Sequence, residues 1–348
     1  MTSVTIVQLP KTAALNAGVG GWITLIATSI IFGIAAMIIA SLNNMFQGEV
    51  LFDYSSKIVG KFVSYFLGVF YLLYFLITSA YLCASMGNVL TQNFFLKTPA
   101  WAILFIGMPF YGYAAYKGVT NIARIFEIYG VIFIVTAVTI HVIMLLQGRI
   151  ENILPLYIPE DTGQYFSAMK NVIIPFLGIE VLVFIPFTKA NGKKAPRTAF
   201  LTILGIGLFY ALVVESSIMM LGMNEIVHNN DPLIAAIRQV DLPFINFLER
   251  MDILYLTVGF MGIFAGKSIV YLAIVEFACR LFPRVKRAVI VIAAGAAIFL
   301  LDLLILDINS FGAFFNVFAI FIGTAAAIVI PVLLFVLAKV KKRAGKIN

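Results

Sequence analysis

The chain has 348 residues, of which 62% are hydrophobic and only 11% are charged. Soluble domains carry about 25% charged residues on average, so this composition excludes a soluble globular protein and indicates a membrane protein with several transmembrane helices. The formal net charge is +8. Membrane topology explains this charge, as shown below, so nucleic acid is not expected as a partner.

Apolar runs of about 20 residues, the length that crosses roughly 30 Å of hydrocarbon, divide the chain into predicted transmembrane helices. We therefore expect an all-α integral membrane protein with ten crossings and one transmembrane domain. The predicted spans are residues 2–17, 21–43, 63–91, 99–116, 122–147, 171–188, 198–222, 250–280, 287–306 and 311–338.

Lys and Arg residues are distributed unequally over the connections between these spans. One set of alternate loops, together with the C-terminus, holds 17 of the 24 basic residues, whereas the opposite set holds six and Lys267 lies within a helix. The positive-inside rule then predicts that both termini are cytoplasmic. Cys83 and Cys279 fall near opposite membrane faces, so no disulfide is expected.

The first and sixth spans carry a proline at comparable places, about ten residues before the next helix, at Pro10 and Pro186. The first proline-marked loop is predicted outside and the second inside, which indicates an inverted repeat of five helices each. The halves would be residues 1–147 and 171–338, followed by a basic cytoplasmic tail, residues 339–348. Because the first helix has only nine residues before its proline, we expect part of that helix to be missing from this chain.

The sixth span contains the sequence PFLGIEVLVFIPF, residues 175–187, in which Gly178 and Glu180 lie between prolines. Irregular backbone at membrane depth is tolerated only where it is buried in protein or lines a polar cavity. A carboxylate at that depth usually marks a substrate or ion site. This segment is therefore predicted to be a broken helix that forms one wall of a small-molecule site.

The longest connection, residues 223–249, contains Asp231 followed by Pro232, which is typical of a helix start. We expect a short amphipathic helix there, either a lid over an outward vestibule or a loop packed on the membrane surface.

Four motifs follow one another along the chain: GWITLI (21–26), LFDYSSKIVGK (51–61), FLGIEVLVFIP (176–186) and FLERMD (247–252). In these motifs, in the basic loop through Lys194 and in the basic tail, the sequence resembles the B subunit of bacterial spore nutrient germinant receptors. This is a permease-like branch of the amino acid, polyamine and organocation transporter superfamily. The resemblance implies a leucine-transporter-like fold with broken helices 1 and 6, A-type and C-type partner subunits, and the inner membrane of the spore.

The resemblance also implies where a small nutrient, expected to be an amino acid, would bind. The family has a Gly-rich stretch in the first helix, whereas residues 3–7 here read SVTIV. In the third predicted span, the hydroxyl of Tyr71, Tyr74 or Tyr81 is expected to close the site. Glu180 could bind a ligand ammonium or take up a proton; alternatively it caps the broken helix or pairs with a cation. The implied ligand-binding residues are Thr5, Ile6, Val7, Tyr81, Phe176, Leu177, Gly178 and Glu180.

Lys267 lies deep within the eighth span, where an unpaired ammonium would be costly to bury. Sodium-coupled relatives of this fold have a sodium site between helices 1 and 8, so the resemblance implies that Lys267 replaces that ion. The alternative is an internal ion pair with Glu180 or bonds to backbone carbonyls. Glu276 lies four residues before Arg280, which suits an ordinary helical ion pair. His141 in the fifth span could titrate, but a lone histidine is expected in the core or at the membrane interface.

The sequence contains no metal-ligand cluster, no phosphate-binding glycine loop and no nucleophile beside a base. We therefore expect no enzyme activity, metal or cofactor. The main interpretation is a germinant-receptor subunit that binds a small nutrient and signals to partner subunits. The alternatives are an amino-acid permease that transports its ligand and an assembly scaffold without a working ligand site.

Overall fold

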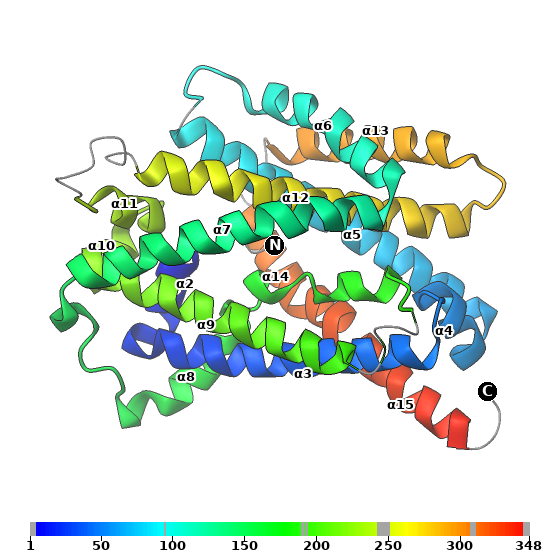
Figure 1. Ribbon diagram of the computed structural model, residues 1–348, viewed down its shortest axis with the longest axis horizontal. Helices are drawn as coiled ribbons and strands as arrows, with labels where there is room; N and C mark the ends of the chain where they lie inside the picture. The colour runs from blue at the N-terminus through cyan, green and yellow to red at the C-terminus, as the bar shows by residue number, and fades with distance from the viewer. Residues whose placement is uncertain are drawn as a thin grey trace. The chain divides into compact units, whose positions relative to one another are not determined.

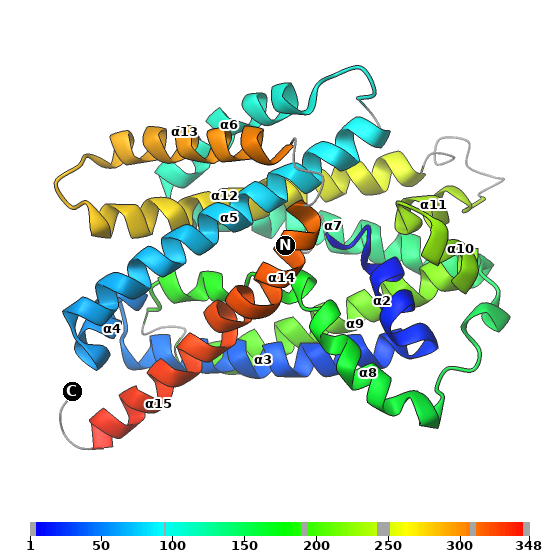
Figure 2. The ribbon, with the colours of Figure 1, turned by 180° about the vertical axis from the view of Figure 1, so that it is seen from behind.

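A computed structural model describes residues 5–93, 95–188, 192, 194–241, 251–306 and 311–343. In these residues the regular structure is helical and no strand occurs, which confirms the predicted all-α integral membrane fold. Residues 1–4, most of the FLERMD motif and the end of the basic tail lie outside the described residues. Figures 1 and 2 show the helices from two sides.

The α-helices follow the predicted apolar runs closely, because each begins or ends near a glycine, a proline or a polar loop. Gly18, Gly60, Gly118 and Gly222 have positive φ at or beside such ends. The helices are α2 (Leu9–Ala17), α3 (Gly21–Met45), α4 (Leu51–Val59), α5 (Lys61–Asn93), α6 (Ala100–Lys117), α7 (Val119–Gln147), α8 (Thr162–Ala168), α9 (Ala195–Leu221), α10 (Met223–His228), α11 (Pro232–Arg238), α12 (Met251–Leu281), α13 (Arg287–Leu306), α14 (Phe311–Phe318) and α15 (Ile330–Arg343).

Seven helical runs in the described residues are long and apolar enough to cross a membrane. The count becomes eight if the pair Pro159–Asn171 and Ile174–Phe184, bent by 53°, is one span. α2 and α3 form a single run, Leu9–Met45, and α6 is not among the seven. The ten crossings and the inverted repeat therefore stay predictions.

The chain forms two compact units, each built from three stretches. Both units contain segments of both predicted halves, so the compact units are not the two predicted repeats. Unit 1 consists of Met1–Gly33, Phe126–Phe176 and Leu201–Ile263, and unit 2 of Ile34–Ile125, Leu177–Phe200 and Phe264–Asn348.

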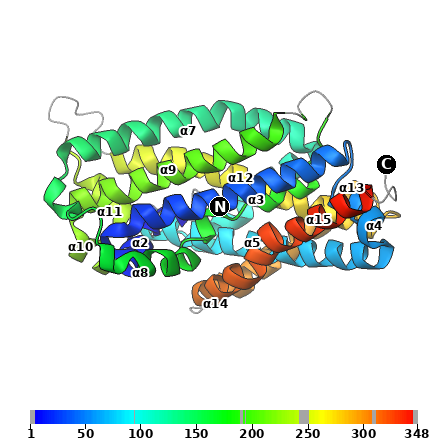
Figure 3. The ribbon, with the colours of Figure 1, turned by 90° about the horizontal axis from the view of Figure 1, so that it is seen from below.

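In unit 1 the short helices α8, α10 and α11 pack against α2, and Figure 3 shows α8 beside α2. The Lys11 ammonium donates to the Asn229 carbonyl at 2.9 Å, and the Thr24 hydroxyl donates to the Tyr165 carbonyl at 2.9 Å. The short helix predicted after Asp231 is confirmed as α11, with Pro232 in its first turn.

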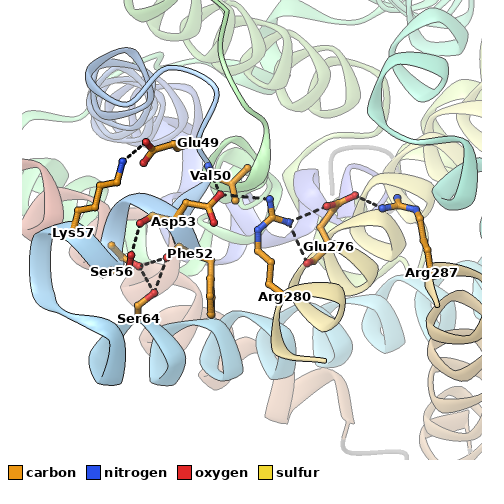
Figure 4. Close-up of polar contacts among 11 residues, drawn as sticks. Glu49, Val50, Phe52, Asp53, Ser56, Lys57, Ser64, Glu276, Arg280 and Arg287 are labelled. Carbon is orange, nitrogen blue, oxygen red and sulfur yellow. Dashed lines mark hydrogen bonds and ion pairs between the residues drawn. The ribbon is translucent and has the colours of Figure 1, made fainter. Parts of the chain in front are cut away.

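In unit 2, α6 and α13 pack along each other (Figures 1 and 2), and α4 packs on the start of α5. Figure 4 shows a polar cluster at this end. Arg280 of α12 pairs with Glu276 at 3.0 Å and with Asp53 of α4 at 3.6 Å, which confirms the predicted helical pair. Arg287, at the start of α13, binds Glu276 at 2.8 Å and the Ala115 carbonyl of α6 at 3.1 Å. Two arginines thus tie four helices together.

Gly207 of α9 marks a close approach to α3 in unit 1. A Cβ atom at Gly207 would lie 2.2 Å from the Ser29 Cβ, whereas a Cβ at Gly205 would meet nothing within 4 Å. We predict that Gly207→Ala destabilises the protein by about 1–3 kcal/mol through overpacking, and that Gly205→Ala does not. Thermal unfolding of the two purified variants measures this difference. Equal melting temperatures would show that α3 and α9 do not pack this closely.

Candidate functional site

The sixth predicted span is broken, as its sequence indicates. The backbone forms two short 3₁₀ stretches, Ile174–Phe176 and Ile179–Phe184, separated by a turn at Gly178 with φ +126°. Such a φ is strained for any residue with a side chain. Pro175 and Pro186 have no N–H and therefore cannot continue a regular helix. The break leaves several peptide groups without helical partners.

Glu180 lies at this break and is almost completely buried, with 1% exposure. One carboxylate oxygen accepts the Gly178 N–H at 2.7 Å, and the other accepts the Tyr74 hydroxyl at 2.7 Å. Glu180 therefore caps the break, as in the structural interpretation of this residue. Each carboxylate oxygen can accept a second hydrogen bond, so this role leaves the carboxylate able to bind a ligand cation.

Tyr74 is the α5 hydroxyl that reaches the break. Its ring also stacks on Phe318 of α14, with ring centroids 5.9 Å apart. Tyr81, which the sequence analysis includes among the ligand-binding residues, stacks on Phe315 of α14 with ring centroids 3.7 Å apart, and its part in ligand binding stays a prediction. Tyr71, Tyr74 and Tyr81 all lie on α5, and their spacing in the sequence does not indicate which hydroxyl faces Glu180.

The remaining predicted ligand residues are divided between the two units. Leu177, in unit 2, packs on Gly323, where a Cβ atom would lie 2.8 Å from the Leu177 Cδ1. Phe176, in unit 1, packs on Phe32 and Tyr210, with ring centroids 5.7 and 5.1 Å away. Thr5, Ile6 and Val7 are also in unit 1 and are buried.

Lys267 has a different partner from the one predicted. Its ammonium donates to the Ser79 carbonyl at 2.9 Å and to the Cys83 sulfur, and it lies 3.6 Å from an Asp302 carboxylate oxygen. The predicted ion pair with Glu180 is therefore corrected: Asp302 is the acidic partner, and Ser79 supplies the backbone carbonyl. Both charged side chains are fully buried.

Asp302 was missed by the sequence analysis, although a signal for it exists. It is the one acidic residue of α13, and a carboxylate within an apolar membrane helix calls for a buried partner. In the described residues neither oxygen of Asp302 makes a hydrogen bond. The Lys267 ammonium is therefore what compensates this buried charge.

His141 is buried in unit 1, where its Nδ1 lies 2.8 Å from the Ser216 hydroxyl. Its ring packs edge-on against Phe209 and Tyr255. This environment is that of a core histidine. Within the described residues, no group of three or more His, Cys, Asp or Glu side chains could hold a metal ion.

We predict strong coupling between Lys267 and Asp302. Removing one partner of a buried pair leaves an uncompensated charge and costs about 3–5 kcal/mol. Lys267→Met and Asp302→Leu should therefore each destabilise the protein strongly, and the double variant should recover most of that loss. Denaturant unfolding of the two single variants and the double variant measures the coupling.

The exposed pair Lys57–Glu49 of unit 2 serves as the control, because surface pairs contribute about 0–1 kcal/mol. Additive effects of the Lys267 and Asp302 substitutions would contradict the pairing seen here.

An all-helical chain with several membrane-length helices, a broken span and fully buried charges is a polytopic membrane protein of the permease-like type. The chain belongs to the family described as spore germination protein, whose family model matches residues 1–311.

The chain is also similar to individual germination proteins. It is 26% identical to spore germination protein YndE of Bacillus subtilis over 283 residues, which cover 78% of this chain and 75% of that protein. It is 26% identical to spore germination protein B2 of the same species over 71% of this chain and 67% of that protein. Spore germination protein GerLB of Bacillus cereus is 23% identical over 93% and 87% of the respective chains. These matches confirm the germinant-receptor B subunit indicated by the motifs, with a role in spore germination.

Proposed function

We propose that this receptor subunit binds an amino acid at the break of the sixth predicted span, around Gly178, and passes the binding event to partner subunits. The observation that carries the proposal is the arrangement of Gly178, Glu180 and Tyr74 at irregular backbone within a membrane-length segment. Broken membrane helices bind small solutes through their freed peptide groups. A carboxylate beside such groups suits a zwitterion, because it binds the ammonium while backbone N–H groups bind the carboxylate.

The electrostatics of Glu180 support a cationic ligand group. The carboxylate is buried, and its two hydrogen bonds within the described residues come from neutral donors, the Tyr74 hydroxyl and the Gly178 N–H. Burying a carboxylate without an opposite charge is expensive. The ammonium group of a ligand would compensate the charge of this carboxylate, so ligand binding would stabilise the protein.

The ammonium of Lys267 supports a further part of the proposal, namely that no sodium ion is coupled to the ligand. The ammonium lies between α5, α12 and α13, where it contacts Ser79, Cys83 and Asp302. A cation bound beside it would be repelled. Lys267 would then replace an ion as the element that neutralises Asp302.

The partners and the location are part of the same proposal. The chain would act with A-type and C-type receptor subunits in the inner membrane of the spore, with both termini on the core side. The family match and the resemblance of the motifs support the partners and the membrane, and the excess of basic residues in one set of loops supports the orientation.

Two other functions use the same features. A permease would need the same ligand site and would also transport the ligand, whereas a scaffold would need no ligand site. We favour the receptor because the homologous proteins are germination proteins. Radiolabelled amino acids, added to proteoliposomes that contain the full chain, distinguish the three. Binding without uptake supports the receptor, uptake supports the permease, and neither supports the scaffold.

We predict that Glu180→Gln weakens binding of the amino acid identified in this assay at least about tenfold, a change of 1.4 kcal/mol. The amide keeps the size of the side chain but loses the charge that binds the ammonium. Equilibrium binding to the purified variant measures the effect. Glu276→Gln, which removes a carboxylate from the polar cluster of Figure 4, is the control and should bind normally. Unchanged affinity in Glu180→Gln would exclude this carboxylate from the site.

We also predict that Gly178→Ala lowers stability by about 1–3 kcal/mol and weakens ligand binding, because a side chain strains the positive φ. Gly266→Ala in α12 is the matched control, since a Cβ there meets nothing within 4 Å. Thermal unfolding and ligand binding are measured on both variants. A Gly178→Ala variant that behaves like Gly266→Ala would show that the turn at Gly178 is not required.

A further inference from the structure

The last membrane helix changes its hydrogen-bond register in the middle. α14 and α15 are joined by two π-helical segments, Ala319–Gly323 and Ala325–Val329, within one apolar run, Phe311–Arg343. Figure 3 shows this run as one continuous helix. The N–H of Thr324 donates to the Ala319 carbonyl, and that of Ile330 to the Ala325 carbonyl. Both bonds span five residues, and such π segments are rare and occur frequently at functional sites.

Pro331 makes the end of this π segment unusual. In the five-residue register, the nitrogen opposite the Ala326 carbonyl belongs to Pro331, which has no N–H. The Ile330 N–H, which would bond this carbonyl in an α-helix, is already bonded to Ala325. The hydroxyl of Tyr71 in α5 donates to the Ala326 carbonyl at 2.7 Å instead. Tyr71 and Ala326 are both fully buried, so this bond has no substitute in water.

The α-helical register would move the orphan carbonyl by one residue. The Ile330 N–H would then bond Ala326, and Pro331 would leave the Ala327 carbonyl without a donor. Each register therefore has one unpaired backbone carbonyl next to Pro331. They differ in that the Tyr71 hydroxyl satisfies this carbonyl in the π register. A buried carbonyl left without a hydrogen bond is costly, and this cost favours the π register over the otherwise similar α-helical one.

The broken sixth span contacts the first π segment, Ala319–Gly323. Leu177 packs on Gly323 so closely that a Cβ atom there would lie 2.8 Å from the Leu177 Cδ1. Tyr74, which bonds Glu180 at the break, stacks on Phe318 directly before the π segment. A movement of the break would therefore act on the register of the last helix through Leu177 and Tyr74.

We propose that residues 319–330 are a two-register switch, held in the π register by the Tyr71 hydroxyl and coupled to the break at Gly178 by Leu177 on Gly323. A change of register by one residue rotates the helix on one side of the segment relative to the other by about 100°. The switch would convert a local rearrangement at the break into a rotation of α15. It does not depend on the identity of a ligand and can be tested without one.

The test measures a distance along the last helix itself. Spin labels are placed by Phe314→Cys and Leu337→Cys, at two exposed positions on either side of the π segment, in the full chain in lipid nanodiscs. Cys279→Ser removes the partly exposed cysteine, and the buried Cys83 stays. The parent should give one distance. Tyr71→Phe should give a second population about 3 Å away, because a rotation of about 100° moves one label around the helix axis.

Tyr65→Phe is the matched control, since it removes an exposed hydroxyl from the same helix and should leave a single distance. Gly323→Ala is a second, independent perturbation that keeps Tyr71. Its methyl group would clash with Leu177, so it should also populate the second distance, and adding Leu177→Ala should restore the first. A single unchanged distance in both Tyr71→Phe and Gly323→Ala would overturn the proposal. So would the second population in Tyr65→Phe.

Discussion

The peptide groups released where membrane helices depart from α-helical geometry must find partners within the protein, because lipid offers none. In the broken span, the Gly178 N–H donates to Glu180, and the Pro175 carbonyl accepts the Tyr210 hydroxyl at 2.9 Å. The Leu182 carbonyl accepts the Asn43 amide at 2.6 Å in addition to the Ile185 N–H. Polar side chains of neighbouring helices therefore hold the break open. The same solution is used at Ala326, where Tyr71 supplies the donor.

This constraint explains why the buried polar side chains occupy fixed positions. A side chain that satisfies a released peptide group is fixed in position by that bond, and it fixes the irregular backbone in turn. Glu180 thus has a structural role and still exposes acceptor capacity at the break. The proposed ligand binding would not compete with this structural role, since a carboxylate has further acceptor positions beyond the two that serve the fold.

The buried Lys267 and Glu180 side chains are stabilised in different ways. Lys267 is bound by Asp302, Ser79 and Cys83, all from helices of unit 2. Glu180 is bound by neutral donors. Lys267 is therefore not the group that stabilises the carboxylate at the break, and in the proposed function a ligand cation would bind there. The arginine cluster of Figure 4 is partly exposed, and its contribution is to join helix ends rather than to compensate a buried charge.

The sequence by itself determined the helices, the membrane class and the break. Apolar runs of membrane length predict α3, α5, α7, α9, α12 and α13 within a few residues, because in lipid a segment can satisfy its backbone only as a helix. Gly178 between two prolines predicts the interruption, since these residues act on the local backbone. The tertiary structure alone decided the partners: Tyr74 for Glu180, Asp302 for Lys267 and Tyr71 for Ala326. Glu180 and Tyr74 are 106 residues apart in the sequence, and Tyr71 and Ala326 are 255 apart. Local periodicity places each residue on its helix, but only the packing of distant helices determines which side chains meet.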